Sequence, residues 1–460
     1  MSKRNTILFI IVLIILTTGV LWYFYFNKST DTINTNTKTE GENFVSNFFN
    51  FGKIKTKEVE DDSTPVTDIS EENEETTIDI QKGNLFKISS MPVAGFTVFM
   101  KERFKEVPNP SPALPLTGEG DNPTSPPAKG GIEGGSKPSA PLTEFVPALR
   151  YVDKATGNIY QTFTDQINER KFSNMEIEGI YEAYFGNNGN TVISRYLKSS
   201  PLLSGETIIT YSGSLPKEIL GNDSVVENNI SGSFLPENII DMSISPNTTK
   251  MFYLFNWKEG VVGTTAFSNG DNKKQIFDSK YTEWLTQWPN ENTITITTKS
   301  ASFVPGFMYI INPNNSSIGL KRILGGIRGL TTLTSPNGKL VLYSNDTVSL
   351  NIYDIETGEA QTLGVKSLPE KCVWGISSDV IYCAVPKLID NSFSYPDSWY
   401  RGEVSFSDDI WRIDVSQGNA KIIFNSEEEI DGVRLMLDQN EDFLFFINKK
   451  DSYLWGLTLE

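Results

Sequence analysis

Histidine is absent from this chain of 460 residues, and only two cysteines are present. The chain therefore lacks the commonest general base, the commonest metal ligand and the relay of a Ser-His-Asp triad. Two cysteines are too few for a four-thiolate zinc site within one chain. Carboxylate, lysine, tyrosine or calcium chemistry remains, but none of these leaves a sharp motif. We expect no catalytic residues, no metal and no cofactor, and hence a protein that is not an enzyme.

An excess of basic residues is also missing, and the formal net charge is -17. Nucleic acid is therefore excluded as a partner, because phosphates require a basic surface. Such acidity mainly favours solubility through self-repulsion. Aromatic residues make up 12% of the chain and charged residues 21%, so a sizeable core can form.

A long apolar run without any charge extends from Ile7 to Phe26. About 20 such residues cross a bilayer as a helix. Lys3 and Arg4 precede the run, so the positive-inside bias predicts residues 1–6 in the cytoplasm and the remaining chain outside. The alternative, a cleaved signal peptide, calls for a shorter apolar core and a small-residue cleavage site. We predict an uncleaved, single-pass anchor in the cytoplasmic membrane.

Residues 27–83 are polar and acidic, which predicts a disordered tether because so little apolar surface can be buried there. Within this tether, apolar residues recur near helical spacing from Phe44 to Phe51. Two interpretations stay open for this patch. It is either a short amphipathic helix that docks on the membrane or a partner, or a transiently sticky piece of linker.

Beyond the tether, one sequence phrase recurs along the chain. Its clearest copy has a turn at Ser335–Gly338, followed by two runs of period two that predict strands. A strand-turn-strand phrase follows each copy. Six units are marked by polar turn residues, namely Asn188, Asn247, Asn290, Asn337, Ser378 and Gln439. Four strands in roughly 40–60 residues is the period of propeller blades.

A seventh unit fits upstream, beginning near Val93 and interrupted by a Pro/Gly-rich insertion, 105–145, that we expect to be disordered. The last unit stops after three strands, whereas the strand-like segment Asn84–Ser90 has no partner of its own. We infer that this segment completes the last blade and closes the ring without exposed edges. The prediction is an all-β, seven-bladed β-propeller over residues 84–460, with six or eight blades as the alternative counts.

The repeated phrase resembles the TolB-like and WD-repeat propeller families over residues 84–460. The Gly-His and Trp-Asp signatures of WD repeats are missing, so the TolB-like side is more similar. In kind, the chain is similar to an uncharacterised group of single-pass, outward-facing bacterial propellers. The resemblance implies a binding scaffold, although these propellers also include hydrolases.

In a propeller, the loops between second and third strands lie on one rim, and the longest of them here is Pro386–Asp409. Aromatic and arginine side chains of the kind enriched at binding hot spots occur in this loop. We predict a partner or ligand site formed by Tyr395, Trp399, Tyr400 and Arg401, joined by Trp257 and Phe303 from other blades. The alternative is that these aromatics pack the loop onto its own blade.

Cys372 and Cys383 flank a hairpin whose turn, at Ser377-Ser378, places them opposite each other. A disulfide persists outside the cytoplasm, but the pair can also stay reduced if the geometry is poor. We expect no catalytic thiol, because no histidine exists to activate it.

Three functions follow. The first is a non-enzymatic, membrane-anchored scaffold outside the cell membrane that binds a protein or an envelope polymer. The second is a carboxylate-dependent glycoside hydrolase or lyase, which needs two Asp/Glu roughly 5–10 Å apart in a cleft. The third is an accessory subunit of an envelope complex that docks through Phe44–Phe51. The oligomeric state is left open.

Overall fold

The computed structural model describes residues 84–105, 142–175, 177–199, 205–216, 218, 230–315 and 319–459. All of them lie in the second of the chain's two units, Ile54–Glu460, and only that unit is described. The predicted anchor, the tether and the Phe44–Phe51 patch lie outside these residues. Within the described ranges, no helix is long and apolar enough to cross a membrane.

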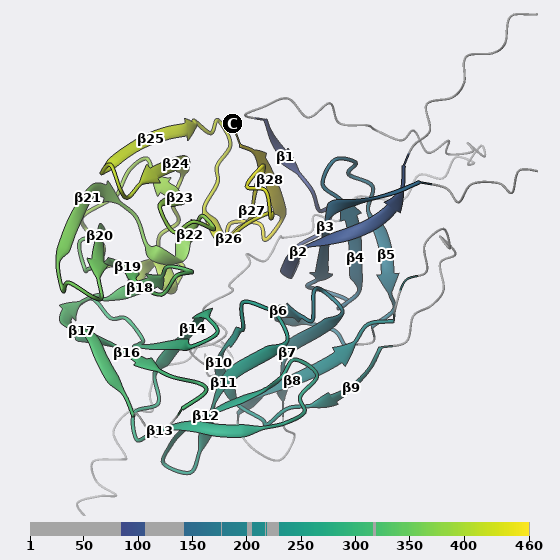
Figure 1. Ribbon diagram of the computed structural model, residues 1–460, viewed down its shortest axis with the longest axis horizontal. Coiled ribbons are helices and arrows are strands. Elements are labelled where there is room, and N and C mark those ends of the chain that lie inside the picture. The colour runs from purple at the N-terminus through teal and green to yellow at the C-terminus, as the bar shows by residue number, and fades with distance from the viewer. Residues whose placement is uncertain are drawn as a thin grey trace, which may run out of the picture. The chain divides into compact units, whose positions relative to one another are not determined.

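Seven four-stranded antiparallel sheets stand around a central axis, which confirms the predicted seven-bladed propeller (Figure 1). Blade 1 consists of β2–β5 (Val93–Phe104, Thr143–Asp153, Ile159–Phe163, Arg170–Ser173). Blade 2 consists of β6–β9 (Ile180–Gly186, Thr191–Ser199, Glu206–Ser214, Ser231–Phe234). Blade 3 consists of β10–β13 (Ile239–Ile244, Lys250–Trp257, Gly260–Phe267, Lys274–Ser279).

The remaining blades follow in chain order. Blade 4 consists of β14–β17 (Trp284–Asn290, Thr293–Thr298, Pro305–Ile311, Lys321–Arg328). Blade 5 consists of β18–β21 (Thr331–Thr334, Leu340–Ser344, Ser349–Asp354, Ala360–Lys366). Blade 6 consists of β22–β25 (Cys372–Trp374, Val380–Pro386, Asp408–Asp414, Asn419–Phe424). Blade 7 consists of β26–β28 (Gly432–Leu437, Phe443–Asn448, Leu454–Thr458) and of β1 (Leu85–Lys87).

The ring is closed by its first strand, as the sequence predicts. β1 pairs antiparallel with β28, with Phe86 opposite Gly456. Asn84 adds a hydrogen bond from its backbone nitrogen to Thr458 Oγ1 at 2.9 Å. The outer edge of blade 7 is thereby covered by a strand from the other end of the propeller sequence, which removes a free edge beside β28.

The repeated phrase forms the turns between first and second strands, and these turns touch one another around the ring. Asn337 caps its own turn through its side-chain oxygen, and its backbone nitrogen donates to Ser378 Oγ in the next blade at 3.2 Å. The backbone nitrogen of Asn188 makes the corresponding contact with Thr248 Oγ1 at 2.7 Å. Gly338 lies at φ 71°, a conformation that glycine adopts without a steric cost.

The core is divided among the seven interfaces between neighbouring blades. Each interface holds one cluster of buried apolar side chains, for example Phe252, Ile294 and Ile296 between blades 3 and 4. A further cluster lies under the Pro386–Asp409 loop. Because the blades pack face to face, the strand centres are fixed and the variation is left to the two rims.

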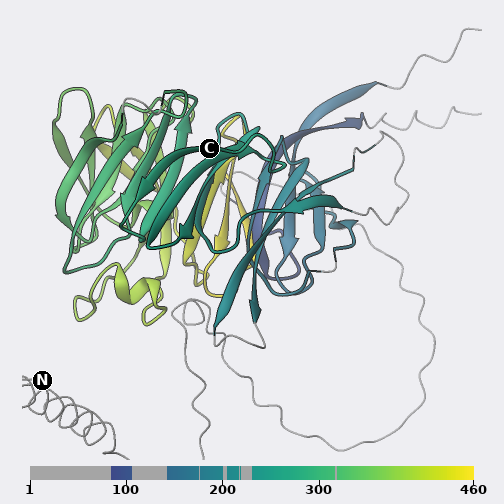
Figure 2. The same ribbon diagram turned by 90° about the horizontal axis from the view of Figure 1, so that it is seen from below.

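Antiparallel connectivity places the loops on two opposite rims. The a–b rim carries the turns between first and second strands and between third and fourth strands, and β1 begins there. The b–c rim carries the loops between second and third strands and the connections between blades. In Figure 2 the yellow-green loop of blade 6 projects on one side of the blades and the blue arm of β2 and β3 on the other.

That arm corrects the predicted bounds of the insertion. β2 and β3 pair as far as Phe104 opposite Thr143, so Thr143–Phe145 belong to a strand rather than to the insertion. Arg103 fixes the arm through ion pairs with Glu144 and Asp165. The predicted disorder of residues 106–141 falls outside the described residues.

Candidate functional site

The Pro386–Asp409 loop is fixed to the b–c rim by a buried cation. Lys371 ends the short 3-10 helix η3 (Pro369–Lys371) just before β22, and its side chain is fully buried. Its amine donates to Asp408 Oδ2 at 2.7 Å, to Asp431 Oδ1, and to Gly432 O at 3.2 Å. Both carboxylates are fully buried too, and each forms an ion pair with the single charge of Lys371.

Asp431 extends this network into the loop. It accepts hydrogen bonds from Trp399 Nε1 at 3.0 Å, from Ser405 Oγ at 3.1 Å and from the backbone nitrogen of Phe406 at 3.1 Å. Burial works to raise the pKa of Asp431, but Lys371, the backbone nitrogen of Phe406 and the charge of Lys449 hold it below its ordinary value. The loop is therefore an ordered element attached to the start of blade 7.

This packing decides where the predicted loop residues lie. Tyr395 and Trp399 are buried, and Phe406 stacks on both of them at ring distances of 5.7 and 6.2 Å. The hydroxyl of Tyr400, in α2 (Asp397–Tyr400), donates to Glu370. Tyr395 and Trp399 thus pack the loop itself, the alternative left open by the sequence, and their rings are not surface contacts.

Other predicted residues of the b–c rim are exposed. Arg401 is exposed and pairs with Glu403 at 2.6 Å. Trp257, at the end of β11, is 58% exposed, and Phe303, before β16, is 76% exposed. Tyr281, in the connection between blades 3 and 4, is 77% exposed and was not predicted. Trp257, Tyr281 and Phe303 are therefore three exposed aromatics on the adjacent blades 3 and 4.

The blade 6 loop reaches across to this region. The backbone nitrogen of Ser302, next to Phe303, donates to Asp397 Oδ2 of α2 at 2.6 Å. Blade 5 lies between these two blades in the ring, so the loop spans its b–c rim. The Phe303 loop is thereby held by β15 and β16 on either side of it and by the contact with the blade 6 loop.

A second candidate region lies at the inner strands, where β-bulges coincide with charged residues. Glu182 follows the bulge of β6 and Asp241 follows the bulge of β10. Arg434 lies inside the bulge of β26, with a φ of 54° in the left-handed region. Bulges re-aim side chains and are frequent beside functional sites, so these residues form a candidate site, which we call the channel cluster.

Glu182 is the common acceptor of the channel cluster. Arg195 of β7 and Arg434 both form ion pairs with it, and Tyr184 donates its hydroxyl at 2.9 Å. Arg434 therefore reaches from blade 7 past blade 1 to blade 2. Gly95 of blade 1 lies close to that point, because a Cβ there would stand 2.0 Å from Ala183 O.

The two carboxyl groups of this cluster differ in their protonation. Burial works to raise the pKa of Glu182, but Arg195 and Arg434 hold it below its ordinary value. Burial, together with the charge of Glu182, raises the pKa of Asp241 to about 7. At neutral pH, Glu182 is ionised and Asp241 is close to its midpoint.

Two carboxylate pairs bear on the hydrolase or lyase hypothesis. Asp408 and Asp431 share Lys371 and have no exposed surface, so a substrate does not reach them. Glu182 and Asp241 remain as the pair for that hypothesis. In the described part of the chain, no group of three or more metal-ligating side chains is placed to hold a metal ion.

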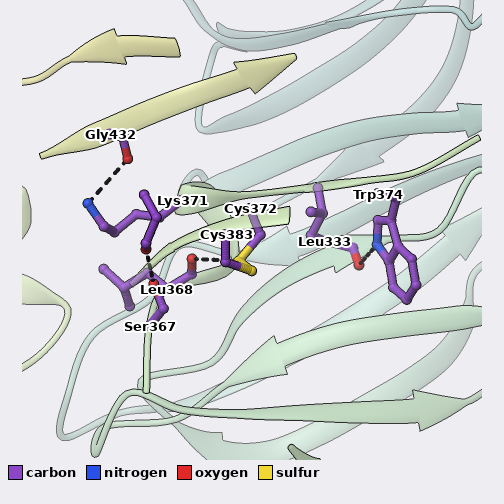
Figure 3. Close-up of a disulfide and its surroundings, with 9 residues drawn as sticks. Leu333, Ser367, Leu368, Lys371, Cys372, Trp374, Cys383 and Gly432 are labelled. Atoms are coloured by element: carbon purple, nitrogen blue, oxygen red, sulfur yellow. Dashed lines mark hydrogen bonds between the residues drawn. A yellow bond between two sulfur atoms is a disulfide. The ribbon is translucent and has the colours of Figure 1, made fainter. Parts of the chain in front are cut away.

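The two cysteines lie directly opposite each other on β22 and β23 and form a disulfide (Figure 3). Both are buried between blades 5 and 6. Figure 3 shows Lys371 immediately before this disulfide, with its amine directed at Gly432. Disulfide and buried cation together fix the start of blade 6 from two sides.

The channel cluster was not found from the sequence. The signal was present as a single charge inside each apolar strand, in YEAYF, IIDMSI and VRLML. An alternating strand with one face solvated gives the same pattern, so charge alone does not mark these residues. Their meeting depends on ring closure, which places Arg434 and Glu182 together although they are 252 residues apart.

No known family description matches the sequence, and no curated protein matches it. Among solved structures, an oligogalacturonate lyase in complex with manganese covers 68% of this chain and 86% of its own, at 9% identity and a TM-score of 0.46. TolB from Acinetobacter baumannii covers 67% of this chain and 61% of its own, at 12% identity and a TM-score of 0.35. The tricorn protease covers 65% and 27%, at 12% identity and a TM-score of 0.32. All three TM-scores are below 0.5, so the propeller assignment rests on the chain's own seven four-stranded sheets and not on these similarities.

Proposed function

We propose that the protein is a non-enzymatic binding scaffold whose b–c rim holds a protein or an envelope polymer. The observation that carries this proposal is the exposure of Trp257, Tyr281 and Phe303 on the adjacent blades 3 and 4. Large aromatic side chains left in solvent on a rigid surface are typical of interaction sites. Arg401, on the blade 6 loop, adds a cation that a partner with acidic groups would pair with.

The rigidity of this rim supports the proposal. The contact between Ser302 and Asp397 and the network around Lys371 hold the loops without a partner. A surface that is ordered before binding loses less conformational entropy when the complex forms. The rim is therefore suited to binding with little rearrangement.

We further propose that Ile7–Phe26 anchors the chain in the cytoplasmic membrane and that the propeller lies outside the cell. The disulfide between Cys372 and Cys383 supports this placement, because disulfides persist in oxidising compartments. The described chain enters at Asn84 on the a–b rim.

Affinity purification of the full-length chain from crosslinked membranes tests this function. The variant Trp257→Ala with Phe303→Ala is compared with Phe267→Ala with Ile376→Ala, which removes exposed apolar groups from the a–b rim. We expect the first variant to recover at least about tenfold less of a partner than the wild type and the control variant recover. Equal recovery by both variants would reject the b–c rim. Arg401→Ala tests the loop separately.

The hydrolase or lyase alternative is favoured by one observation, the opposite pKa shifts of Glu182 and Asp241. Pairs of carboxyl groups with separated pKa values often serve as base and acid. Release of reducing ends from a panel of polysaccharides measures this activity. Turnover by the wild type and its loss in Asp241→Asn would replace the scaffold proposal, whereas no turnover would leave the scaffold in place.

The accessory-subunit alternative assigns docking to Phe44–Phe51, outside the described residues. Replacing its phenylalanines by serine while keeping Trp257 and Phe303 separates the two ideas. Loss of the partner in this variant alone would favour the tether patch over the rim.

A further inference from the structure

We propose that the channel cluster binds an oxyanion, a carboxylate or phosphate group of a small ligand, through Arg434 with Lys154 and Arg195 beside it. This site is distinct from the b–c rim aromatics and does not depend on the scaffold function. It rests on the geometry of Arg434, on the shortage of acceptors around it and on the excess of positive charge.

The first argument is the conformation and the accessibility of Arg434. Its left-handed φ of 54° is strained for a residue with a side chain, and such strain concentrates at functional sites. Its side chain nevertheless stays 36% exposed, although it reaches across blade 1 to blade 2. A residue whose only role was to join two blades would be expected to lie buried between them.

The second argument is the number of hydrogen bonds. Within the described residues, Arg434 donates to Glu182 Oε1 and to Ala183 O at 3.3 Å. These bonds use two of the five N–H groups of a guanidinium, which has no acceptor of its own. Glu182 already receives Arg195 and Tyr184. The planar guanidinium therefore has donors left for a second oxyanion, and bidentate pairing with carboxylate or phosphate suits its shape.

The third argument is the local charge. Two guanidinium groups share Glu182, and Asp241 is ionised only in part at neutral pH. Burial and the positive charge of Arg434 lower the pKa of Lys154 to about 8, which places this amine within the same field. Lys154, between β3 and β4, also contacts Ser452 Oγ of blade 7 at 3.4 Å. A positive site thus persists in a chain of net charge -17, where an anion would otherwise be repelled.

Isothermal titration of the full-length chain in detergent with inorganic phosphate, and separately with acetate, tests the site. We expect saturable one-site binding of at least one of these anions. The anion that binds identifies the ligand group as phosphate or carboxylate. Absence of saturable binding with both anions would overturn the proposal.

Two variants break the same ion pair, and the proposal predicts opposite effects of these variants on anion affinity. Arg434→Gln removes the binding group and is expected to weaken anion binding at least about tenfold, the range for hydrogen bonds to charged groups. Glu182→Gln removes the competing carboxylate and is expected to strengthen it. A purely structural ion pair would make both variants lose binding together, and that outcome would overturn the proposal.

The remaining variants serve as controls. Arg322→Gln removes an exposed arginine on β17, the outer strand of blade 4, and is expected to leave anion binding unchanged. Lys154 takes no part in the ion pairs of Glu182. The variant Lys154→Gln therefore tests the proposal if Arg434→Gln or Glu182→Gln fails to fold. A severalfold loss of affinity with an unchanged melting temperature supports the proposal, and unchanged affinity contradicts it.

Discussion

Lys371 shows what one buried side chain does for the propeller. It forms ion pairs with two fully buried aspartates, one from blade 6 and one at the start of blade 7, and it thereby holds the long loop of blade 6 against blade 7. Removing one partner of a buried ion pair is costly because the other charge stays uncompensated. Here two charges would be left behind, so Lys371 is expected to be among the most sensitive positions.

We predict that Lys371→Met lowers the free energy of unfolding by about 3–5 kcal/mol. Lys387→Met is the matched control, because Lys387 is partly exposed and lies 3.4 Å from Asp409. Such a surface pair contributes about 1 kcal/mol or less. Urea unfolding of both variants measures the difference, and equally small losses would contradict the assignment of Lys371.

Asp241 gives a prediction that depends on pH. Burial raises its pKa to about 7 in the folded protein, from an ordinary value of 3.8. Between these values the folded state retains a proton that the unfolded state releases, so this group lowers stability as pH rises from about 4 to 7.

We therefore expect Asp241→Asn to stabilise the protein at pH 8. Near pH 4 this stabilisation should disappear, because Asp241 is then protonated in the folded state. Thermal unfolding of the variant and the wild type across this range measures the trend. A difference between them that is constant with pH would show that Asp241 is not a titrating group in this window.

At the scale of elements, β1 closes the ring. Phe86 lies in the middle of this short strand and is buried against blade 7, where its ring occupies the space of the missing side chain of Gly456. The same residue type ends β9 of blade 2 as Phe234, which is 61% exposed. The two phenylalanines allow a matched comparison of outer strands.

Phe86→Ala is expected to lower the free energy of unfolding by about 3–5 kcal/mol, the cost of deleting a buried aromatic ring. Phe234→Ala should cost about 1 kcal/mol, because it loses mainly its ring contact with Tyr211. Denaturant unfolding measures both values. Similar losses for the two variants would show that β1 does not secure the ring.

The elements also show which parts of the fold can be predicted from the sequence. The turn of Ser335–Gly338 and its copies mark six blades, and the strand pattern beginning near Val93 adds the seventh, because turn residues and period-two strands are local signals. The pairing of β1 with β28 follows from counting strands in the last blade. The ordering of the blade 6 loop does not follow, because it depends on Lys371 meeting Asp431, which lies 60 residues away along the chain.

For the candidate site residues, the sequence could not predict which side chains are exposed and which are buried. Trp257, Phe303 and Arg401 stay on the surface, whereas Trp399 and Tyr395 pack the loop. In the sequence, all of these are aromatic or arginine residues in or beside b–c loops, and nothing local distinguishes the buried ones from the exposed ones. Burial depends on which loop aromatics reach Asp431 and Phe406, a property of the folded rim alone.

At the scale of the whole propeller, the two rims differ. Turns on the a–b rim contact one another between blades, as Asn337 does with Ser378, so the turns of this rim link neighbouring blades and stabilise the ring. The b–c rim carries the long ordered loop and the exposed aromatics of blades 3 and 4. Binding is therefore proposed where the repeated turn phrase is absent.

Site-specific photo-crosslinking in intact cells tests the central claim most directly. A photoreactive amino acid is placed at position 303 on the b–c rim and, as a control, at position 267 on the a–b rim. We predict a discrete crosslinked adduct from position 303 and none from position 267. Adducts from position 267 alone, or equal adducts from both positions, would contradict the proposal that the b–c rim is the binding surface.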